Sequence, residues 1–330
     1  MLDVEERMVH PRSPLWSALL TRILPTMPTI TTYLLDMEDE TGHHCGLIQM
    51  RTRPDRPEQD VIFLAPSLEH GNGSHAVWQR LLTYVSVRAG EYGYHRVYGR
   101  LVQGSDEAQI FRNVGFSAYA EEEIYRLDIE KFPALTYPSL NLRKQTTADS
   151  WSLQRLYAAV TPRTVQIAEG LAQGQWQLNA RFAGGRERRA GYVWEREGEI
   201  LAALHIRFGK SGNALRCLIH PDVDDQIDAL IETGLQVIQK AQPKLDKPIF
   251  SNIRTYQAEM GTILQEYGFE KVTTQAVMVK HNTVRAKDYL TRLVEAPIEA
   301  KAASPTPFVN ADTAVSQKAN GRMKPKQVTE

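Results

Sequence analysis

The sequence predicts an α/β (α+β) protein that contains one structural unit twice. The length of 330 residues suggests two domains, because domains typically run to about 100–200 residues. Strand and helix patterns alternate in the same order in both halves. Two landmarks also recur: Gly115-Phe116 returns 153 positions later as Gly268-Phe269, and Pro66 returns 155 positions later as Pro221. A near-constant offset indicates two copies of one unit, each with its own core.

The composition excludes several classes of protein. Lys and Arg total 39 and Asp and Glu total 39, so the zero net charge argues against a generally basic nucleic-acid-binding protein. Two cysteines, Cys45 and Cys217, are too few for a disulfide framework, and we therefore expect a reducing, cytoplasmic location. The apolar runs are shorter than the roughly 20 residues of a spanning helix, and the N-terminus lacks the apolar core of a secretory signal, so no membrane association is expected.

The first half is predicted to be a helix, a hairpin and then alternating strands and helices. Pro25 stops the first apolar helical pattern, and Gly115 is a good terminating residue for the last helix. Residues 38–42 form the turn of the hairpin. The predicted helices are 15–24, 76–90 and 106–114, and the predicted strands are 30–37, 45–51, 61–64, 95–102 and segments of 116–129.

The second half repeats this order after a proline-containing stretch. Residues 132–139 carry two prolines and little periodicity, which predicts a linker between a first domain at 1–131 and a second at 140–283. Thr147 or Asp149 caps the first helix of this half. The predicted strands are 140–145, 190–196, 200–208, 214–219, 248–254 and 271–280, and the helices run to 160 and over 225–241 and 257–267. Residues 284–296 can add a terminal helix, and the polar composition of 297–330 predicts a disordered tail.

This order of elements resembles the GNAT superfamily of N-acetyltransferases, and the second half resembles it most. LNLRKQTTADSWSLQRLY (140–157) is similar to the opening strand and first helix of that fold. CLIHPDVDDQIDALIETGLQVIQKA (217–241) is similar to its central strand, turn and cofactor helix, and IRTYQAEMGTILQEYGFEKVTTQAVMVK (253–280) to its last helix, Gly-Phe corner and final strands. The resemblance covers residues 15–282 as a tandem pair. It implies two domains that pair within the chain, each a mixed, mostly antiparallel sheet with a splayed central strand pair and flanking helices.

The resemblance implies acetyl-CoA as a cosubstrate, bound where two parallel strands diverge. Its pyrophosphate would rest on backbone amides at a helix N-terminus, in a loop that the family writes Gln/Arg-x-x-Gly-x-Gly/Ala. The loop 220–228 of the second half departs from this pattern, since it has no glycine and four aspartates that would repel phosphate. The first half is more permissive and offers the candidate cofactor-binding residues Gly71, Asn72, Gly73 and Ser74.

Two other interpretations of the first-half loop stay open. It can be a polar loop that only begins a helix. The family's loop motif can also be aligned with this sequence by counting back from Gly93. In that alignment Ala76 and Trp78 fall at the two glycine positions of the motif, and the Trp78 side chain would block close approach of phosphate.

Acyl transfer needs a base for the amine and an acid for the leaving thiolate. Many family members use as the acid a tyrosine four residues before the glycine of the Gly-Phe corner, and here Phe111 and Leu264 hold those positions. Glu69, at the end of a strand, is a candidate catalytic base, and His220 occupies the matching place in the second half. Polar residues of the first-helix region and the end of a central strand are candidate substrate contacts: Arg163, Gln166, Asn252 and Tyr256.

Metal binding is not expected from the sequence. In His43-His44-Cys45 only His43 and Cys45 would point to the same face of a strand, and no second ligand pair with zinc spacing follows. The function predicted from the resemblance is transfer of an acyl group from CoA to the amine of a small molecule or a protein. The alternative is a catalytically inactive GNAT-fold protein that binds a ligand or a partner, because both cofactor loops and both tyrosine positions depart from the family pattern.

Overall fold

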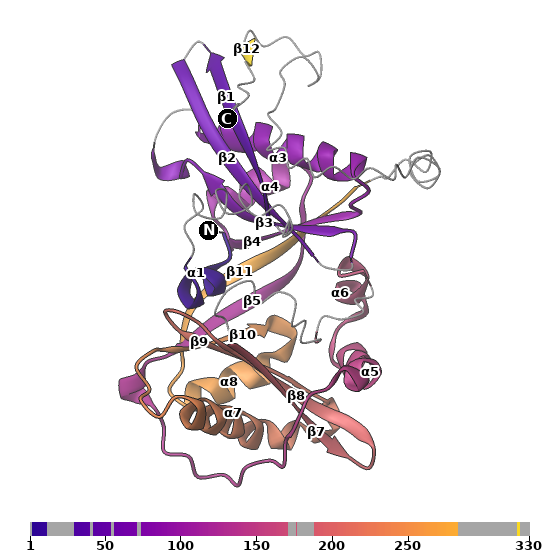
Figure 1. The fold of residues 1–330 in the computed structure, drawn as a ribbon, viewed down its shortest axis with the longest axis vertical. Coiled ribbons are helices and arrows are strands. Elements are labelled where there is room, and N and C mark those ends of the chain that lie inside the picture. Colours follow the sequence, from indigo (N-terminus) through magenta and orange to yellow (C-terminus); the bar gives the residue numbers. More distant parts are fainter. Residues whose placement is uncertain are drawn as a thin grey trace, which may run out of the picture. The chain divides into compact units, whose positions relative to one another are not determined.

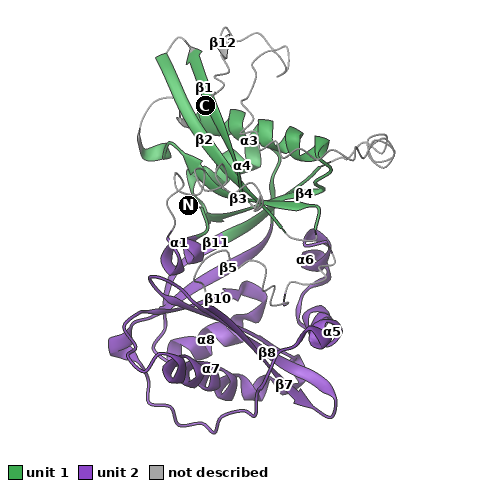
Figure 2. Ribbon diagram, viewed as in Figure 1, with its two compact units in different colours: residues 1–3, 12–118, 276–330 green, residues 4–11, 119–275 purple. Residues whose placement is uncertain are grey.

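The computed structural model describes residues 2–11, 30–39, 42–53, 56–70, 74–170, 176, 188–282 and 322–323. The chain divides into two compact units (Figure 2): unit 1 comprises residues 1–3, 12–118 and 276–330, and unit 2 comprises residues 4–11 and 119–275. The predicted helices at 15–24 and 284–296 and nearly all of the predicted tail lie outside the described residues. The predicted domain limits, 1–131 and 140–283, stay a prediction.

Unit 1 is a mixed sheet with helices packed on it (Figure 1). Its strands follow the order β12–β1–β2–β3–β4–β11, and β3 and β4 are parallel whereas β1, β2 and β3 are antiparallel neighbours. The strands are β1 (Ile30–Asp39), β2 (Gly42–Thr52), β3 (Glu58–Ala65), β4 (Arg96–Val102), β12 (Arg322–Met323) and the end of β11 (Glu270–His281); the helices are η1 (Leu68–His70), α3 (Ser74–Glu91) and α4 (Asp106–Asn113).

The core of unit 1 forms between α3 and the sheet. The apolar spacing that predicts this helix is confirmed, because Val77, Leu81, Leu82 and Val85 are all buried. The helix approaches β2 closely at Gly46, where an added β-carbon would lie 2.2 Å from Cγ1 of Val77. Only glycine therefore fits at this contact.

Unit 2 repeats the mixed sheet with its own helices. Its strands follow the order β11–β5–β10–β9–β8–β7–β6, with β9 and β10 parallel. The strands are β5 (Ser117–Leu127), β6 (Arg143–Lys144), β7 (Arg188–Arg196), β8 (Glu199–Phe208), β9 (Asn213–Ile219), β10 (Ile249–Arg254) and the start of β11. The helices are α1 (Val4–Val9), η2 (Ile129–Lys131), η3 (Thr147–Asp149), α5 (Ser150–Val160), α6 (Arg163–Ala168), η5 (Pro221–Gln226), α7 (Ile227–Ala241), η6 (Thr255–Gln257) and α8 (Ala258–Glu266).

Helices cover both faces of the sheet of unit 2. On one face, α7 and α8 bury Leu230 and Leu264 against alternate strand residues such as Leu215. On the other face, α5 packs on β7, β8 and β9 through a smaller cluster that contains Leu153 and Leu218. Alternation of buried residues to opposite faces is what a strand covered on both sides requires.

The predicted elements within the described residues are found, with differences at several positions. The strand expected at 140–145 is reduced to Arg143–Lys144, and the helix expected from 225 begins at Ile227 after the short η5. Two short helices, α1 and α6, were not predicted, because six-residue segments carry too little periodicity.

The predicted linker is fixed to α7 by a buried carboxylate. Glu232 on α7 is 1% exposed, and its oxygens accept from the backbone N–H groups of Thr136 (3.1 Å) and Tyr137 (2.8 Å) and from the hydroxyl of Tyr267 (3.1 Å). The hydroxyl of Thr233 accepts from the N–H of Leu140 at 2.9 Å. These bonds give the buried carboxylate of Glu232 its partners and hold the exposed connection against α7.

The Gly-Phe corners of the two units have the same geometry. Gly115 and Gly268 both have positive φ, at 90° and 83°, a conformation in which glycine is favoured after a helix. The amide of the following Phe116 bonds the carbonyl of Phe111 at 3.0 Å, and the amide of Phe269 bonds that of Leu264 at the same distance. The sequence repeat is therefore a structural repeat at this position.

A neutral histidine lies partly buried in the sheet of unit 2. Nε2 of His205 on β8 lies 2.7 Å from Oε1 of Gln145, and because an amide oxygen only accepts, the ring donates from Nε2. Nε2 of Gln145 in turn donates to the carbonyl of Trp176 at 2.6 Å. Burial, reinforced by the charges of Arg216 and Arg189, lowers the pKa of His205 to about 3. The imidazole thus stays uncharged at neutral pH.

Candidate functional site

Each unit contains a parallel strand pair that is bonded at one end only. In unit 1, β3 and β4 pair over Glu58–Asp60 and Arg96–Tyr98, although β3 continues to Ala65 and β4 to Val102. In unit 2, β9 and β10 pair over Asn213–Leu215 and Ile249–Ser251, although they continue to Ile219 and Arg254. Both pairs therefore separate halfway along, as the family resemblance predicts.

The loop after β9 is closed by its own side chains. His220 caps η5, with Nδ1 accepting from the N–H of Asp222 at 3.2 Å, and the N–H of Val223 bonds the carbonyl of His220 at 3.1 Å. The N–H of Ile227 bonds the carbonyl of Asp224. Three amides of this loop are thus already used, and the exposed residues Asp222, Asp224 and Asp225 lie in the same loop. Such a loop disfavours a pyrophosphate.

The corresponding helix of unit 1 starts differently. Helix α3 begins at Ser74 and has no acidic residue in its first turn, where an acid would offset the partial positive charge of the helix N-terminus. Glu69 is exposed in η1, between β3 and α3. The candidate residues Gly71, Asn72 and Gly73 lie outside the described residues, as does the side chain of Ser74.

Trp78 closes part of the space at the end of β3. Its side chain is buried, and its indole N–H donates to the carbonyl of Pro66 at 2.7 Å. If Trp78 stood at a glycine position of the cofactor-loop motif, its buried and hydrogen-bonded indole would lie where phosphate has to approach. The geometry of Trp78 favours the register built on Gly71 and Gly73 for any phosphate binding.

The two positions that hold tyrosine in many relatives are filled by core side chains. Phe111 on α4 is fully buried and its ring contacts the ring of Phe116, with centroids 4.8 Å apart. Leu264 on α8 is 1% exposed. Neither side chain has a proton to give, so a general acid would have to come from elsewhere, or from water.

A buried polar network lies beside the end of β10 in unit 2. The carboxylate of Glu169, which follows α6, is buried and accepts from the guanidinium of Arg254 at 2.8 Å and the hydroxyl of Tyr119 at 3.1 Å. It also accepts from the hydroxyl of Tyr157 on α5. Burial, together with the adjacent Glu169, raises the pKa of Tyr157. These contacts join β5, α5, α6 and β10.

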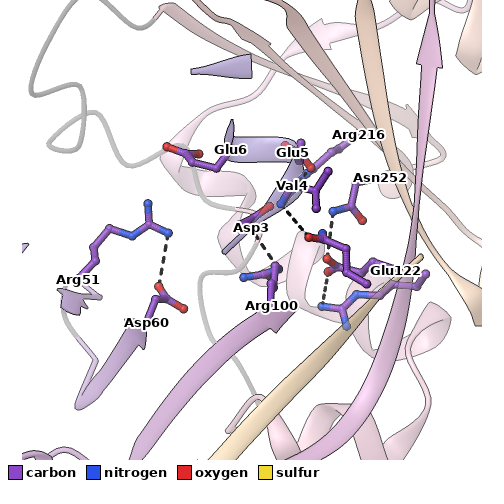
Figure 3. A network of polar contacts seen from close by, with 12 residues as sticks. Asp3, Val4, Glu5, Glu6, Arg51, Asp60, Arg100, Glu122, Arg216 and Asn252 are labelled. Carbon is purple, nitrogen blue, oxygen red and sulfur yellow. Dashed lines mark hydrogen bonds and ion pairs between the residues drawn. The ribbon is translucent and has the colours of Figure 1, made fainter. Parts of the chain in front are cut away.

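A second buried carboxylate shares the same arginine. Glu122 on β5 is 3% exposed and contacts Nη2 of Arg254 at 3.1 Å and the amide Nδ2 of Asn252 at 3.1 Å. Figure 3 shows the Glu122 and Asn252 side chains directed toward one another. Two buried carboxylates therefore depend on one arginine whose side chain is 13% exposed.

Helix α1 brings two more acids to the sheet of unit 2. Glu5 is 2% exposed and lies 2.6 Å from Nη2 of Arg216 on β9 (Figure 3). Glu6 lies 2.9 Å from Nη1 of Arg207 on β8. Burial would raise the pKa of Glu5, but the charges of Arg216 and Arg207 outweigh it and lower the pKa below its usual value. The sequence does not predict these contacts, because the partners are 201 and 211 residues apart along the chain.

Ion pairs also stabilise the bonded end of the splayed pair in unit 1. Nη2 of Arg51 lies 3.6 Å from Asp60 on β3, and Arg100 on β4 lies 3.8 Å from Asp3 (Figure 3). Although burial opposes ionisation, the charges of Arg53 and Arg51 lower the pKa of Asp60 far below its usual value.

The predicted substrate contacts take different places in unit 2. Asn252 belongs to the buried network, and Tyr256 in η6 is partly buried next to it, with a pKa that burial raises. Arg163 is exposed at the start of α6. The buried amide of Gln166 donates to the carbonyls of Ala158 and Thr161, at 3.1 and 2.7 Å. The roles of these residues stay predictions, and the bonds of Gln166 favour a structural one.

We expect Gln166→Ala to destabilise unit 2 without changing ligand binding. The substitution leaves the carbonyls of Ala158 and Thr161 without their donor, which costs about 1–3 kcal/mol of the free energy of unfolding. Urea unfolding of the variant and the wild type measures this loss. Arg163→Ala is the matched control on the same helix and should change stability by no more than about 0.5 kcal/mol. Equal stability of Gln166→Ala and wild type would contradict the structural role.

Comparison with solved structures identifies the fold. No protein-family model and no curated protein matches the sequence. A tandem GNAT protein from the clavulanic acid biosynthesis pathway is similar over 78% of this chain and 85% of its own, with 13% identity and a TM-score of 0.50. A GCN5-related N-acetyltransferase from Sphaerobacter thermophilus matches over 74% of this chain and 80% of its own (10% identity, TM-score 0.48), and one from Kribbella flavida over 83% and 96% (10% identity, TM-score 0.45).

The likeness to the tandem GNAT protein shows that this chain has a two-domain GNAT-like fold, as the sequence predicted. The two splayed strand pairs and the repeated Gly-Phe corners are the local features of that fold in this chain. At 13% identity the likeness concerns the fold, and the chemistry has to be argued from the residues of this chain. Among the helices that the structure describes, none is both long and apolar enough to cross a bilayer.

Proposed function

We propose that the chain is an acyl-CoA-dependent N-acyltransferase that binds its cosubstrate, acetyl-CoA, in unit 1. The observation that supports this most is the splayed pair β3–β4, followed by a long helix whose first turn carries no acid. A helix N-terminus of this kind favours phosphate, whereas the aspartates and the closed amides after β9 disfavour it. The contrast between the two units supports binding of the cosubstrate in the first.

The reaction is direct attack of an amine on the thioester carbonyl. A C–N bond forms, the C–S bond breaks, the amine loses a proton and the departing thiolate gains one. Backbone amides at the separated ends of β3 and β4 would polarise the carbonyl oxygen. Glu69 is exposed between β3 and α3 and is our candidate for the base that takes the amine proton. The acceptor is the amine of a small molecule or of a protein.

Acetyl-CoA should bind and stabilise the wild-type protein. A ligand at 100 times its dissociation constant raises the free energy of unfolding by about 2.7 kcal/mol. Gly73→Trp should abolish binding measured by calorimetry, because a bulky side chain would keep phosphate away from the start of α3. His220→Ala is the matched control in unit 2 and should bind normally. Unchanged binding by Gly73→Trp and loss in His220→Ala would move the site to unit 2.

A non-catalytic binding protein is the second candidate. The observation that favours it is the absence of a proton donor at both family positions, since Phe111 and Leu264 belong to the cores. In that case the GNAT-like fold would hold a ligand or partner without transferring an acyl group. Lack of acetyl-CoA binding by calorimetry would exclude the enzyme and leave this candidate. Binding together with release of free CoA thiol in the presence of an amine would exclude the binding protein.

A further inference from the structure

We propose that Asp36, His43 and Cys45 form a zinc site on the β1–β2 hairpin of unit 1. These three residues bring a carboxylate oxygen, an imidazole nitrogen and a thiol sulfur within 4.8 Å of one another. The inference goes beyond the proposed acyltransfer and does not depend on it. It also runs against the expectation from sequence that no metal is bound.

The pairing of the two strands brings the three side chains together. His43 and Cys45 are two residues apart on β2, so they point to the same face of the sheet. Asp36 on β1 is the direct cross-strand partner of Cys45, and side chains of directly opposed residues share a face. The third ligand therefore comes from the neighbouring strand. A search for ligands at fixed spacing within one stretch of sequence does not find it.

The sulfur is placed as a tetrahedral zinc site requires. Bond lengths of about 2.3 Å to sulfur and 2.0–2.2 Å to nitrogen or oxygen put neighbouring ligand atoms about 3.6 Å apart. Sγ of Cys45 lies 3.7 Å from Nδ1 of His43 and 3.8 Å from Oδ1 of Asp36. Both distances agree with that value to within about 0.2 Å.

The carboxylate and the imidazole must separate for metal to enter. Nε2 of His43 lies 2.5 Å from Oδ1 of Asp36, which is the distance of an ion pair or hydrogen bond. Nδ1 of His43 faces Sγ of Cys45, and one imidazole nitrogen binds one metal ion, so the Asp36 carboxylate has to leave Nε2 and turn toward Nδ1 for all three ligands to meet the same ion. Side-chain rotation allows this, because the His43 side chain is 58% exposed and that of Asp36 is 27% exposed.

The ligand set selects the class of metal. A thiolate with an imidazole and a carboxylate suits zinc, whereas magnesium and calcium prefer oxygen ligands only. Three protein ligands on an exposed hairpin leave the fourth position to water or to another ligand. Copper would bind the same set more tightly by the general order of divalent metals, so a zinc site here depends on which metal is supplied.

Cobalt titration of the full, tag-free chain tests the site. Co²⁺ in place of zinc should give a sulfur-to-cobalt absorption band that saturates at one equivalent, and added Zn²⁺ should remove it. Cys45→Ser should lose the band, and Asp36→Ala and His43→Ala should each weaken Co²⁺ binding by about tenfold or more. His44→Ala and Cys217→Ala are the controls: His44 points to the other face, and Cys217 is buried and free on β9.

The outcomes separate a three-ligand site from a reactive thiol. Loss of the band in Cys45→Ser with weakened binding in Asp36→Ala and His43→Ala supports the site. A wild-type protein without the band, or a band that Cys45→Ser retains, would overturn it. So would unchanged Co²⁺ affinity in both Asp36→Ala and His43→Ala. Thermal unfolding of the metal-free variants checks that each of them is folded before its metal binding is compared with that of the wild type.

Discussion

Replacing Arg254 by methionine should cost about 3–5 kcal/mol of the free energy of unfolding. The guanidinium of Arg254 contacts the buried carboxylates of both Glu122 and Glu169, and removing one partner of a buried ion pair leaves an uncompensated buried charge. Urea unfolding measures the loss.

Two further variants show whether charge is the cause. Arg155→Met removes an exposed ion pair with Glu199 and should cost no more than about 1 kcal/mol. Adding Glu122→Gln and Glu169→Gln to Arg254→Met should restore part of the stability, because the buried charges are then gone. If Arg254→Met costs no more than Arg155→Met, the carboxylates do not depend on Arg254.

Acid should destabilise the wild type more than His205→Gln. Below about pH 6.5 the unfolded chain protonates this histidine, whereas the folded chain resists until about pH 3. The unfolded state then binds the extra proton, so stability falls by about 1.4 kcal/mol for each pH unit between these limits. Above pH 6.5 the histidine is neutral in both states and contributes no slope. Glutamine keeps an N–H donor for Gln145 but does not titrate.

Urea unfolding at pH 7, 6, 5 and 4 measures the difference between the two proteins. Other groups titrate alike in both, so the gap in the free energy of unfolding should widen steadily as the pH falls. Parallel curves would mean that the folded protein accepts a proton on His205, and that the burial of the ring does not control its charge.

The fold could be predicted because its signals are local. Val77, Leu81, Leu82 and Val85 show helical spacing in the sequence and are buried together in unit 1. Gly115 and Gly268 mark the same corner by a backbone conformation that glycine favours. Such signals occur in both halves of the sequence, so the internal repeat could also be predicted.

The polar contacts could not be predicted, because they join residues far apart in sequence. Glu5 and Glu6 look like part of a solvent-exposed charged segment until Arg216 and Arg207 are placed beside them. Asp36 becomes a ligand partner of Cys45 only through the register of the hairpin. Asn252 and Tyr256 are predicted as substrate contacts from their place at the end of a central strand, but the carboxylates of Glu122 and Glu169 have no such local signal.

The division of β11 between the units affects how the chain folds during synthesis. The first part of β11, to Gln275, belongs to unit 2, whereas Ala276 and Met278 are buried in the core of unit 1. Unit 1 therefore lacks part of its core until the ribosome has made residue 281, although most of its sequence emerges first. Unit 2 has its last residue at 275 and can be complete earlier. The amino-terminal unit can therefore complete its core only after the carboxy-terminal unit has been synthesised. A chain that ended at the linker would lack the β11 residues of that core.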